Sequence, residues 1–371
     1  MVIVIKLGKK FINIVYYFIK KFNPIKENKV LFLSRQSNTL SLDFLLLQNE
    51  LINMTSNRIE IKYICNRLDD NKKGIIKFII DSFKSMYHLA TSKVCVLDSY
   101  WPIVSICKHK KELTIIQMWH SIGKIKKSGH QTVGKPSGRS KEISNLLCMH
   151  QNYDIIISSA ESWNQFYLQS FNTSLDKLYN IGLPRIDYLL RTNEFNKERI
   201  LDEYPFLKEK KVILYAPTFR RNIIPKWEEL LEYIDFDKYF LIVKSHPNQK
   251  INTDNPNILT CPEFSAVRLL SVCEYLITDY SAIAVEAAIL NKKTYYYLYD
   301  YDEYLIKNGV NVDPFYSMPG CAFKNAKDLI MDLESGNYNQ NSLDNYREKY
   351  LPKELGTSTA KLAQLVLDKL S

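Results

Sequence analysis

Two histidines follow apolar runs that are typical of β-strands, and they are the residues best suited to acid–base chemistry. His120 comes directly after Leu113–Trp119, and His246 comes directly after Tyr239–Ser245. An imidazole titrates near neutral pH, so it can take a proton from a hydroxyl group, as a general base does, or give one up. We therefore predict that both histidines are catalytic. The alternative is a structural role, with His120 capping a turn and His246 buried.

Basic and polar residues accompany both histidines and follow a third apolar run, Lys211–Ala216. They are Gly123, Lys124, Lys126 and Lys127 after His120, Thr218, Arg220 and Arg221 after the third run, and Lys244 before His246. Lysine ammonium groups attract phosphates, and an arginine guanidinium can bind two phosphate oxygens at once. We predict a site for a phosphorylated substrate, although a solvated loop explains Arg221 equally well.

A fourth stretch, Leu276–Ala288, predicts a strand that turns through Asp-Tyr-Ser into an apolar helix. We predict that Ser281 caps this helix and that the backbone amides at its positive end bind phosphate. Glu286, one turn into the helix, could accept hydrogen bonds from ribose hydroxyl groups. Thr278 and Asp279 complete the candidate substrate-binding residues of this stretch. The alternative is ordinary helix capping with Glu286 in solvent.

Metal-binding motifs are weak in this sequence. It contains neither His-Glu-x-x-His nor a Gly-Lys-Ser/Thr P-loop, and its Asp-x-Asp strings are Asp235–Asp237 and Asp300–Asp302. The first string precedes a predicted strand, at the wrong end of the sheet, and a solvated acidic turn is the favoured interpretation of the second. We expect no metal and no cofactor, with lysine, arginine, histidine and a helix N-terminus neutralising the phosphates.

Length and composition limit the class of protein. A chain of 371 residues predicts two domains or three, and 46% apolar residues suffice for a large core, which excludes a disordered chain. With 50 Lys+Arg against 40 Asp+Glu, the formal charge of +10 favours anionic partners, unless it reflects only a lysine-rich composition. The 7 cysteines show no Cys-x-x-Cys spacing, which indicates reduced thiols and a cytosolic compartment.

Short apolar runs alternate with helical patterns along the chain. Continuously apolar strands indicate sheets covered on both faces, and strand–helix–strand alternation indicates parallel pairing. Two such series predict two doubly wound α/β domains facing a central cleft, where ligands bind at the carboxyl ends of the strands. We place these domains at residues 23–195 and 196–371, with the charged stretch Arg191–Lys211 as the boundary. The C-terminal helices, the last near Ser358–Leu370, could pack back across it.

Residues 1–22 predict a basic amphipathic helix. The longest uncharged run, Phe11–Ile19, is far shorter than the roughly 20 residues that a bilayer span needs, and no signal-peptide cleavage site follows. The helix could lie in an anionic membrane surface, with its apolar side buried there and its lysines facing headgroups. These lysines are Lys6, Lys9, Lys10, Lys20 and Lys21. The alternative is a first helix that packs on the core of its own domain.

Together the four stretches resemble the CDP-glycerol glycerophosphotransferase family, the teichoic acid and capsule polyol-phosphate transferases. The shared pattern is Trp119-His120 with Gly123 and Lys126-Lys127-Ser128-Gly129, then Ala216 to Arg220, His246-Pro247, and Thr278 to Ser281 with Glu286. Order and spacing match over roughly residues 110–290. Two features depart from the pattern: Ala282 stands in place of a second serine, and the insert Gly134–Lys141 has no family role that we can assign.

The resemblance implies a two-domain GT-B-like fold and a peripheral enzyme on the cytoplasmic face of the cell membrane. The N-terminal domain would be the acceptor side and the C-terminal domain would bind the nucleotide. An acceptor hydroxyl would attack the β-phosphorus of CDP-glycerol, and CMP would leave. We assign His120 as the base and His246, with Lys244, as pyrophosphate stabiliser or acid, roles that the histidines could exchange. Ser281 and the helix amides would bind phosphate, and Glu286 would bind ribose.

The expected partners are CDP-glycerol or another CDP-alditol, a lipid-linked glycan or polyol-phosphate acceptor, and the anionic membrane surface. Three alternatives stay open: a CDP-ribitol donor, a GT-B glycosyltransferase or sugar-nucleotide epimerase, and a basic protein that binds membranes or nucleic acid without catalysis. Against the last, basic and histidine residues gather at strand ends and no RNA-binding aromatic motif occurs, so we expect no nucleic acid partner.

Overall fold

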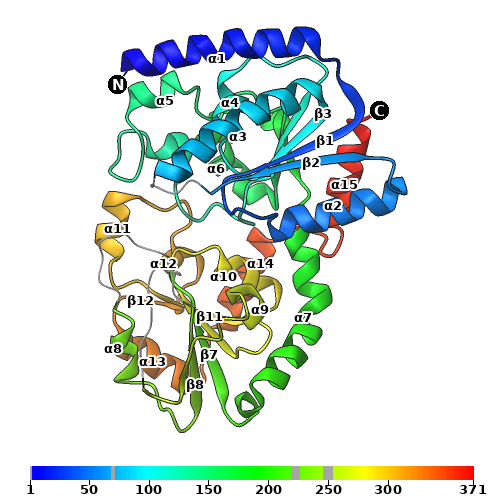
Figure 1. Cartoon of the computed structure of the whole chain (residues 1–371). Coiled ribbons are helices and arrows are strands. Elements are labelled where there is room, and N and C mark those ends of the chain that lie inside the picture. Colours follow the sequence, from blue (N-terminus) through cyan, green and yellow to red (C-terminus); the bar gives the residue numbers. More distant parts are fainter. Residues whose placement is uncertain (1, 68–71, 219–225, 245–253) are drawn as a thin grey trace. The chain divides into compact units, whose positions relative to one another are not determined.

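The computed structural model describes residues 2–67, 72–218, 226–244 and 254–371. The chain divides into two compact units, each built around one sheet (Figure 1). Unit 1 comprises residues 1–121, 128–187 and 354–371, and unit 2 comprises residues 122–127 and 188–353. The units differ from the expected ranges because the C-terminal helix belongs to unit 1 and six residues after His120 belong to unit 2.

Both sheets have six strands and are parallel throughout the described pairs. Unit 1 has the strand order β2-β1-β3-β4-β5-β6, and unit 2 has the order β12-β11-β10-β7-β8-β9. In unit 1 the strands are β1 (Lys26–Ser34), β2 (Glu60–Cys65), β3 (Ser92–Leu97), β4 (Thr114–Gln117), β5 (Ile155–Ser158) and β6 (Leu178–Asn180). In unit 2 they are β7 (Lys211–Tyr215), β8 (Tyr239–Val243), β9 (Ile258–Leu259), β10 (Tyr275–Thr278), β11 (Lys293–Tyr297) and β12 (Ala322–Phe323).

Helices connect successive strands. Those before residue 188 are α1 (Val2–Phe22), α2 (Leu42–Thr55), α3 (Lys72–Thr91), α4 (Pro102–Ile106), α5 (Lys141–Leu146) and α6 (Glu161–Phe171), with the 3₁₀ turns η1 (Gly129–Thr132) and η2 (Leu175–Lys177). Then follow α7 (Pro184–Glu203), η3 (Pro205–Lys208), α8 (Glu228–Leu231), α9 (Ala266–Leu269), α10 (Ile283–Ile289), α11 (Tyr301–Lys307), α12 (Pro314–Ser317), α13 (Ala326–Ser335), α14 (Gln340–Tyr350) and α15 (Ser358–Asp368). This alternation of strands and helices confirms the predicted doubly wound α/β class.

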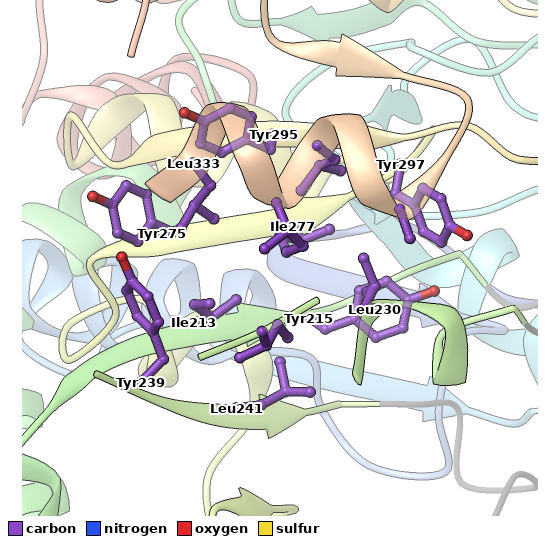
Figure 2. Packing of buried hydrophobic residues seen from close by; sticks show 14 of the residues in the cluster. Ile213, Tyr215, Leu230, Tyr239, Leu241, Tyr275, Ile277, Tyr295, Tyr297 and Leu333 are labelled. Carbon is purple, nitrogen blue, oxygen red and sulfur yellow. The ribbon is translucent and has the colours of Figure 1, made fainter. Parts of the chain in front are cut away.

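Helices cover both faces of the unit 2 sheet, so its strands carry apolar side chains on both faces. Successive strand residues point to opposite faces, so Ile213 and Tyr215 lie in one core cluster and Val212 and Leu214 in another. Figure 2 shows the first cluster, in which side chains of β7, β8, β10 and β11 meet helices α8 and α13. The second cluster packs against α9 and α10. Continuous burial of this kind is what the unbroken apolar runs predicted.

Helix α7 takes up most of the charged stretch Arg191–Lys211, which the sequence predicted as the domain boundary. Ile186, Leu189, Asn196 and Ile200 are buried at intervals close to the helical repeat, and the charged residues between them cover the exposed side. The high charge therefore belongs to a solvated helix face. The short strands β6, β9 and β12 were missed, because runs of two or three residues carry no periodic signal.

Helix α1 covers the predicted residues and packs on unit 1 through one side. Tyr16 is fully buried, and its hydroxyl lies 2.8 Å from His109 Nδ1. Lys9 Nζ donates to the carbonyl oxygen of Leu146 at 3.3 Å, so this lysine faces its own domain. Among the described helices, none combines the length and the apolar character that a membrane span requires.

In both sheets the strand order reverses beside the first strand of the unit. β1 pairs with β2 on one side and with β3 on the other, and β7 pairs with β8 and β10 in the same way. The connections therefore leave in opposite directions at these points, which lie between β1 and β3 and between β7 and β10. Doubly wound folds bind their ligands at the carboxyl ends of the strands at such points.

Candidate active site

His120 of unit 1 lies just beyond the carboxyl end of β4. Its Nδ1 is 2.9 Å from the backbone carbonyl oxygen of Asp98, which follows the neighbouring strand β3. A carbonyl oxygen can only accept a hydrogen bond, so Nδ1 carries the proton and the lone pair of the neutral ring is on Nε2. His120 is half-buried. This arrangement gives a fixed imidazole whose Nε2 can act as a general base.

Asp98, which orients His120 through its carbonyl group, also has a buried side chain. The Ser34 hydroxyl donates to Asp98 Oδ2 at 2.8 Å, joining the ends of β1 and β3. Burial raises the pKa of the Asp98 carboxyl to about 6, and the hydrogen bond from Ser34 opposes this effect only in part. Asp98 is therefore a buried carboxyl group, held between the ends of β1 and β3, whose pKa lies above its ordinary range.

Trp119 holds His120 from the other side. Its φ of 61° lies in the left-handed region, which is unfavourable for a bulky side chain and is found preferentially at functional sites. The Trp119 and His120 ring centroids are 4.3 Å apart. The strained backbone and the tilted contact between the two rings restrict the direction in which the imidazole points.

In unit 2, the predicted residues after β7 and β10 meet at the strand-order reversal. The backbone N–H of Thr218 donates to both carboxylate oxygens of Asp279 at 2.9 Å, and the Thr278 hydroxyl donates to the carbonyl oxygen of Ala216 at 2.7 Å. Asp279 and Thr278 are buried. A carboxylate that ties one strand-end loop to the next makes this edge of the sheet rigid, as a nucleotide site requires.

The basic loop after His120 reaches this cluster from the other part of the sequence. Lys126 Nζ donates to Thr218 Oγ1 at 3.4 Å. Asn311, which belongs to no sequence motif identified above, holds the loop in place. Its backbone N–H donates to the carbonyl oxygen of Ile125 at 2.7 Å, and its side-chain amide donates to that of Lys124 at 2.8 Å. The backbone N–H of Lys127 donates to the carbonyl oxygen of Gly309 at 3.2 Å, which is a second contact between the two segments.

Three other predicted residues are placed less favourably than expected. Lys244 Nζ donates to the carbonyl oxygens of Thr260 and Cys261 at 3.2 and 3.1 Å, and burial lowers the pKa of its ammonium group. Gly123 is buried in unit 2. Ser281 is not the cap of α10, because Ala282 occupies the N-cap position and no side chain caps that helix. The seven-residue α10 is entered through a turn, in which the Ala284 N–H donates to the Ser281 carbonyl oxygen.

Glu286 on α10 is 4% exposed, which rules out the solvated helix residue considered as the alternative. The predicted contact between Glu286 and a ribose stays a prediction. Two predicted site residues, Arg220 and His246, lie outside the described residues.

The described part of the chain contains no group of three or more His, Cys, Asp or Glu residues placed to hold a metal ion. Asp302 of the second Asp-x-Asp string pairs with Lys324 at 2.9 Å. The expected absence of a metal and of a cofactor stays a prediction.

The family described as CDP-Glycerol:Poly(glycerophosphate) glycerophosphotransferase matches residues 15–368. The chain belongs to this family. The resemblance drawn from the four sequence stretches is thereby confirmed, and with it the prediction that the chain is a member of a family of phosphotransferase enzymes.

The relatives reported below are named for ribitol phosphate or for glycerol phosphate. The chain is 32% identical over 346 residues to the teichoic acid poly(ribitol-phosphate) polymerase of Bacillus spizizenii, which covers 89% of the chain and 54% of the polymerase. It is 29% identical over 372 residues to the teichoic acid ribitol-phosphate primase of that organism, covering 95% of the chain and 94% of the primase. It is 30% identical over 302 residues to the teichoic acid glycerol-phosphate primase of Bacillus subtilis, covering 79% and 78%. The chain therefore spans about half of the polymerase and nearly all of the ribitol-phosphate primase.

Solved structures confirm the predicted fold class. The wall teichoic acid polymerase TagF superposes with a TM-score of 0.77 at 18% identity, covering 98% of this chain and 94% of that chain. A UDP-GlcNAc 2-epimerase from Methanocaldococcus jannaschii superposes with a TM-score of 0.56 at 15% identity, covering 92% and 99%. At such identities the likeness concerns the fold, and it includes both a phosphotransferase and a sugar-nucleotide enzyme.

The raised pKa of Asp98 predicts a pH-dependent stability. Because the folded pKa of about 6 exceeds the ordinary value of 3.8, the native state binds an extra proton between these pH values. This carboxyl therefore stabilises the fold fully below about pH 4, and that contribution is lost as the pH rises through 6. We expect the unfolding free energy of the wild type, relative to Asp98→Asn, to fall by about 2 kcal/mol from pH 4 to pH 7.

Denaturant unfolding at several pH values measures this difference. Asp202→Asn, which changes an exposed carboxylate on α7, is the matched control and should give a smaller pH-dependent difference. A difference between wild type and Asp98→Asn that stays constant over this range would show that Asp98 is ionised in the folded protein at pH 4.

Proposed function

We propose that this chain transfers a polyol phosphate from a CDP-alditol to a hydroxyl group of a membrane-linked teichoic acid or capsule acceptor and releases CMP. The observation that carries the proposal is the tautomer of His120 at the end of β4, in which Nδ1 carries the proton and Nε2 carries the lone pair that a general base needs. Family membership supplies the reaction class. The two strand-order reversals supply one candidate binding point in each unit for the two substrates.

The reaction needs a base for the nucleophile and positive charge for the phosphates. The acceptor oxygen forms a bond to the β-phosphorus of the CDP-alditol as its proton passes to His120 Nε2. The bond between that phosphorus and the bridging oxygen breaks, and CMP leaves with the electron pair. A proton returned to CMP or to water completes the cycle. We assign His246 as the group that stabilises or protonates the leaving phosphate.

The donor would bind to unit 2. Thr218 and Asp279 form the rigid wall of its site, and Lys126 brings an ammonium group to the same place. Charge-assisted contacts of this kind suit a pyrophosphate. We further propose that Arg220 binds phosphate oxygens and that the buried carboxylate of Glu286 accepts hydrogen bonds from the ribose.

The alditol is glycerol or ribitol, since named relatives include enzymes of both kinds. Glycerol is the prediction from the sequence pattern. A glycosyl transfer or epimerisation would use the same fold, as the epimerase neighbour illustrates. The family match and the four sequence stretches favour the alditol donor over the sugar nucleotide.

A donor panel tests this proposal. Purified protein with a soluble acceptor analogue should release CMP from CDP-glycerol or CDP-ribitol and should release no nucleotide from UDP-GlcNAc. Lys126→Gln should raise the KM for the CDP-alditol about tenfold, since a hydrogen bond to a charged group contributes about 1.5–3 kcal/mol. Lys307→Gln, which removes an exposed lysine of unit 2, should leave that KM unchanged. Turnover of UDP-GlcNAc alone would reject the proposal.

We also propose that α1 attaches the enzyme to the cytoplasmic face of the membrane. The side of α1 away from unit 1 carries large exposed apolar residues together with three exposed lysines. The apolar ones are Ile3, Val4, Leu7, Phe11, Ile14, Tyr17, Phe18 and Phe22, and the lysines are Lys6, Lys10 and Lys21. Lys9 and Lys20, predicted to face headgroups, donate instead to backbone carbonyl groups of unit 1.

Helix α3 extends the same apolar surface. It packs against α1, exposes Ile75, Ile76, Ile79 and Ile80, and closes an apolar cavity of about 270 Å³ with α1 and α4. An exposed apolar surface with lysines at its edge fits an anionic bilayer, where each lysine adds about 1 kcal/mol.

Point variants separate membrane attachment from packing. Leu7→Glu and Phe11→Glu change exposed side chains, so binding to vesicles that contain anionic lipid should weaken without a change in the thermal midpoint. Ile306→Glu, at an exposed apolar residue of unit 2, is the control and should bind vesicles like the wild type. Unchanged vesicle binding by both α1 variants would refute the attachment.

A further inference from the structure

A polar cavity of about 400 Å³ lies in unit 1 beside His120, and the reaction described above gives it no role. Its wall includes residues that follow β1, β3 and β4, so it opens at the carboxyl edge where the strand order reverses. The lining residues that matter here are Arg35, Ser99, Tyr100, Trp119, Arg139 and His150. Small-molecule sites occupy about 300–1,000 Å³, which includes this volume.

Among the described residues that line it, the cavity has two arginines and no acidic residue. In the described part of the chain, no carboxylate comes within ion-pairing distance of Arg35 or Arg139. The pKa of Arg35 is lowered by burial and by the nearby charge of Arg139, so the two cations repel each other. The buried Nε of Arg35 finds no hydrogen-bond acceptor among the described residues. Two guanidinium groups that repel each other, with no described carboxylate to neutralise them, fit an anion.

Both arginines are held in position before any ligand binds. Arg35 Nη1 donates to the carbonyl oxygen of Tyr100 at 3.2 Å, and the Arg139 guanidinium lies 5.1 Å from the Tyr100 ring centroid. The Arg139 carbonyl oxygen accepts a hydrogen bond from Gly134 N–H at 2.9 Å. A Cβ on Gly138 would lie 1.8 Å from the carbonyl oxygen of Thr132, so only glycine allows this close turn. Residues of the insert Gly134–Lys141 are thus fixed against the cavity.

The cavity adjoins the candidate base through Trp119, which lines it and whose ring contacts that of His120. We propose that Arg35 and Arg139 bind a phosphate group of the acceptor in this cavity and thereby position the acceptor's terminal hydroxyl at His120 Nε2. The inference rests on the proposed function, and it assigns a role to the sequence insert. Arg139 is the better residue to test, because it is exposed, whereas Arg35 is partly buried and donates to the carbonyl oxygen of Tyr100.

The test uses two soluble acceptor analogues that differ only in one linkage. In one, the terminal polyol is joined through a phosphodiester, and in the other through a neutral ether. Arg139→Gln should raise the KM for the phosphodiester analogue about 10- to 100-fold, and leave the KM for the ether analogue and for the CDP-alditol unchanged. Lys135→Gln removes a charge from the same loop outside the cavity and should behave like the wild type.

Other results would overturn the inference. An unchanged KM for the phosphodiester analogue, or equal rises for both analogues, would show that no acceptor phosphate meets Arg139. A raised KM for the CDP-alditol would assign the cavity to a donor phosphate. Inorganic phosphate should compete with the acceptor in the wild type and not in Arg139→Gln; competition with the donor instead would also reject the acceptor site.

An equilibrium binding measurement distinguishes failure of this inference from failure of the proposed function. The phosphodiester analogue, titrated without donor, should bind the wild type at least tenfold more tightly than Arg139→Gln. Equal binding refutes the phosphate cavity even when the wild type releases CMP. Absence of CMP release from every CDP-alditol refutes the proposed function, whatever the titration shows.

Discussion

Parallel strand pairing on both sides of β1 and β7 is the constraint on which the candidate site depends. Parallel strands bring their carboxyl ends to one edge of the sheet, so residues far apart in sequence meet there. In unit 1 this edge gathers Asp98 and His120, and in unit 2 it gathers Thr218 and Asp279. The apolar strand interiors, covered by helices on both faces, make this register the favourable one.

Backbone groups fix most of the chemistry at these strand ends. A carbonyl oxygen selects the tautomer of His120, and a backbone N–H holds the carboxylate of Asp279. In each contact one partner is a backbone group whose position follows from the strand register, so the side chain is held as long as the sheet is intact. Trp119 adds a strained φ and a tilted ring contact at the point where β4 ends. The unfavourable backbone angle is therefore found where the imidazole must be held in place.

The sequence predicted those parts of the fold that rest on local patterns. The strand Tyr275–Thr278 matches its predicted bounds, and the polar residues after the apolar runs do lie at strand ends. Contacts between segments that lie far apart in the sequence leave no local pattern from which they could be predicted. Asn311 could not be recognised as the support of the basic loop, and Arg35 could not be paired with Arg139, about a hundred residues away. The capping role of Ser281 failed because the helix begins one residue later than the serine pattern suggested.

The tautomer of His120 supports its proposed role as the base, and one measurement tests that role most directly. Single-turnover CMP release from a CDP-alditol should fall at least about 100-fold in His120→Gln, because no other group would take the proton from the acceptor hydroxyl. The variant should bind the CDP-alditol like the wild type and unfold at the same temperature. A His120→Gln protein that binds donor normally and still releases CMP at close to the wild-type rate would contradict this role and leave His120 a structural residue.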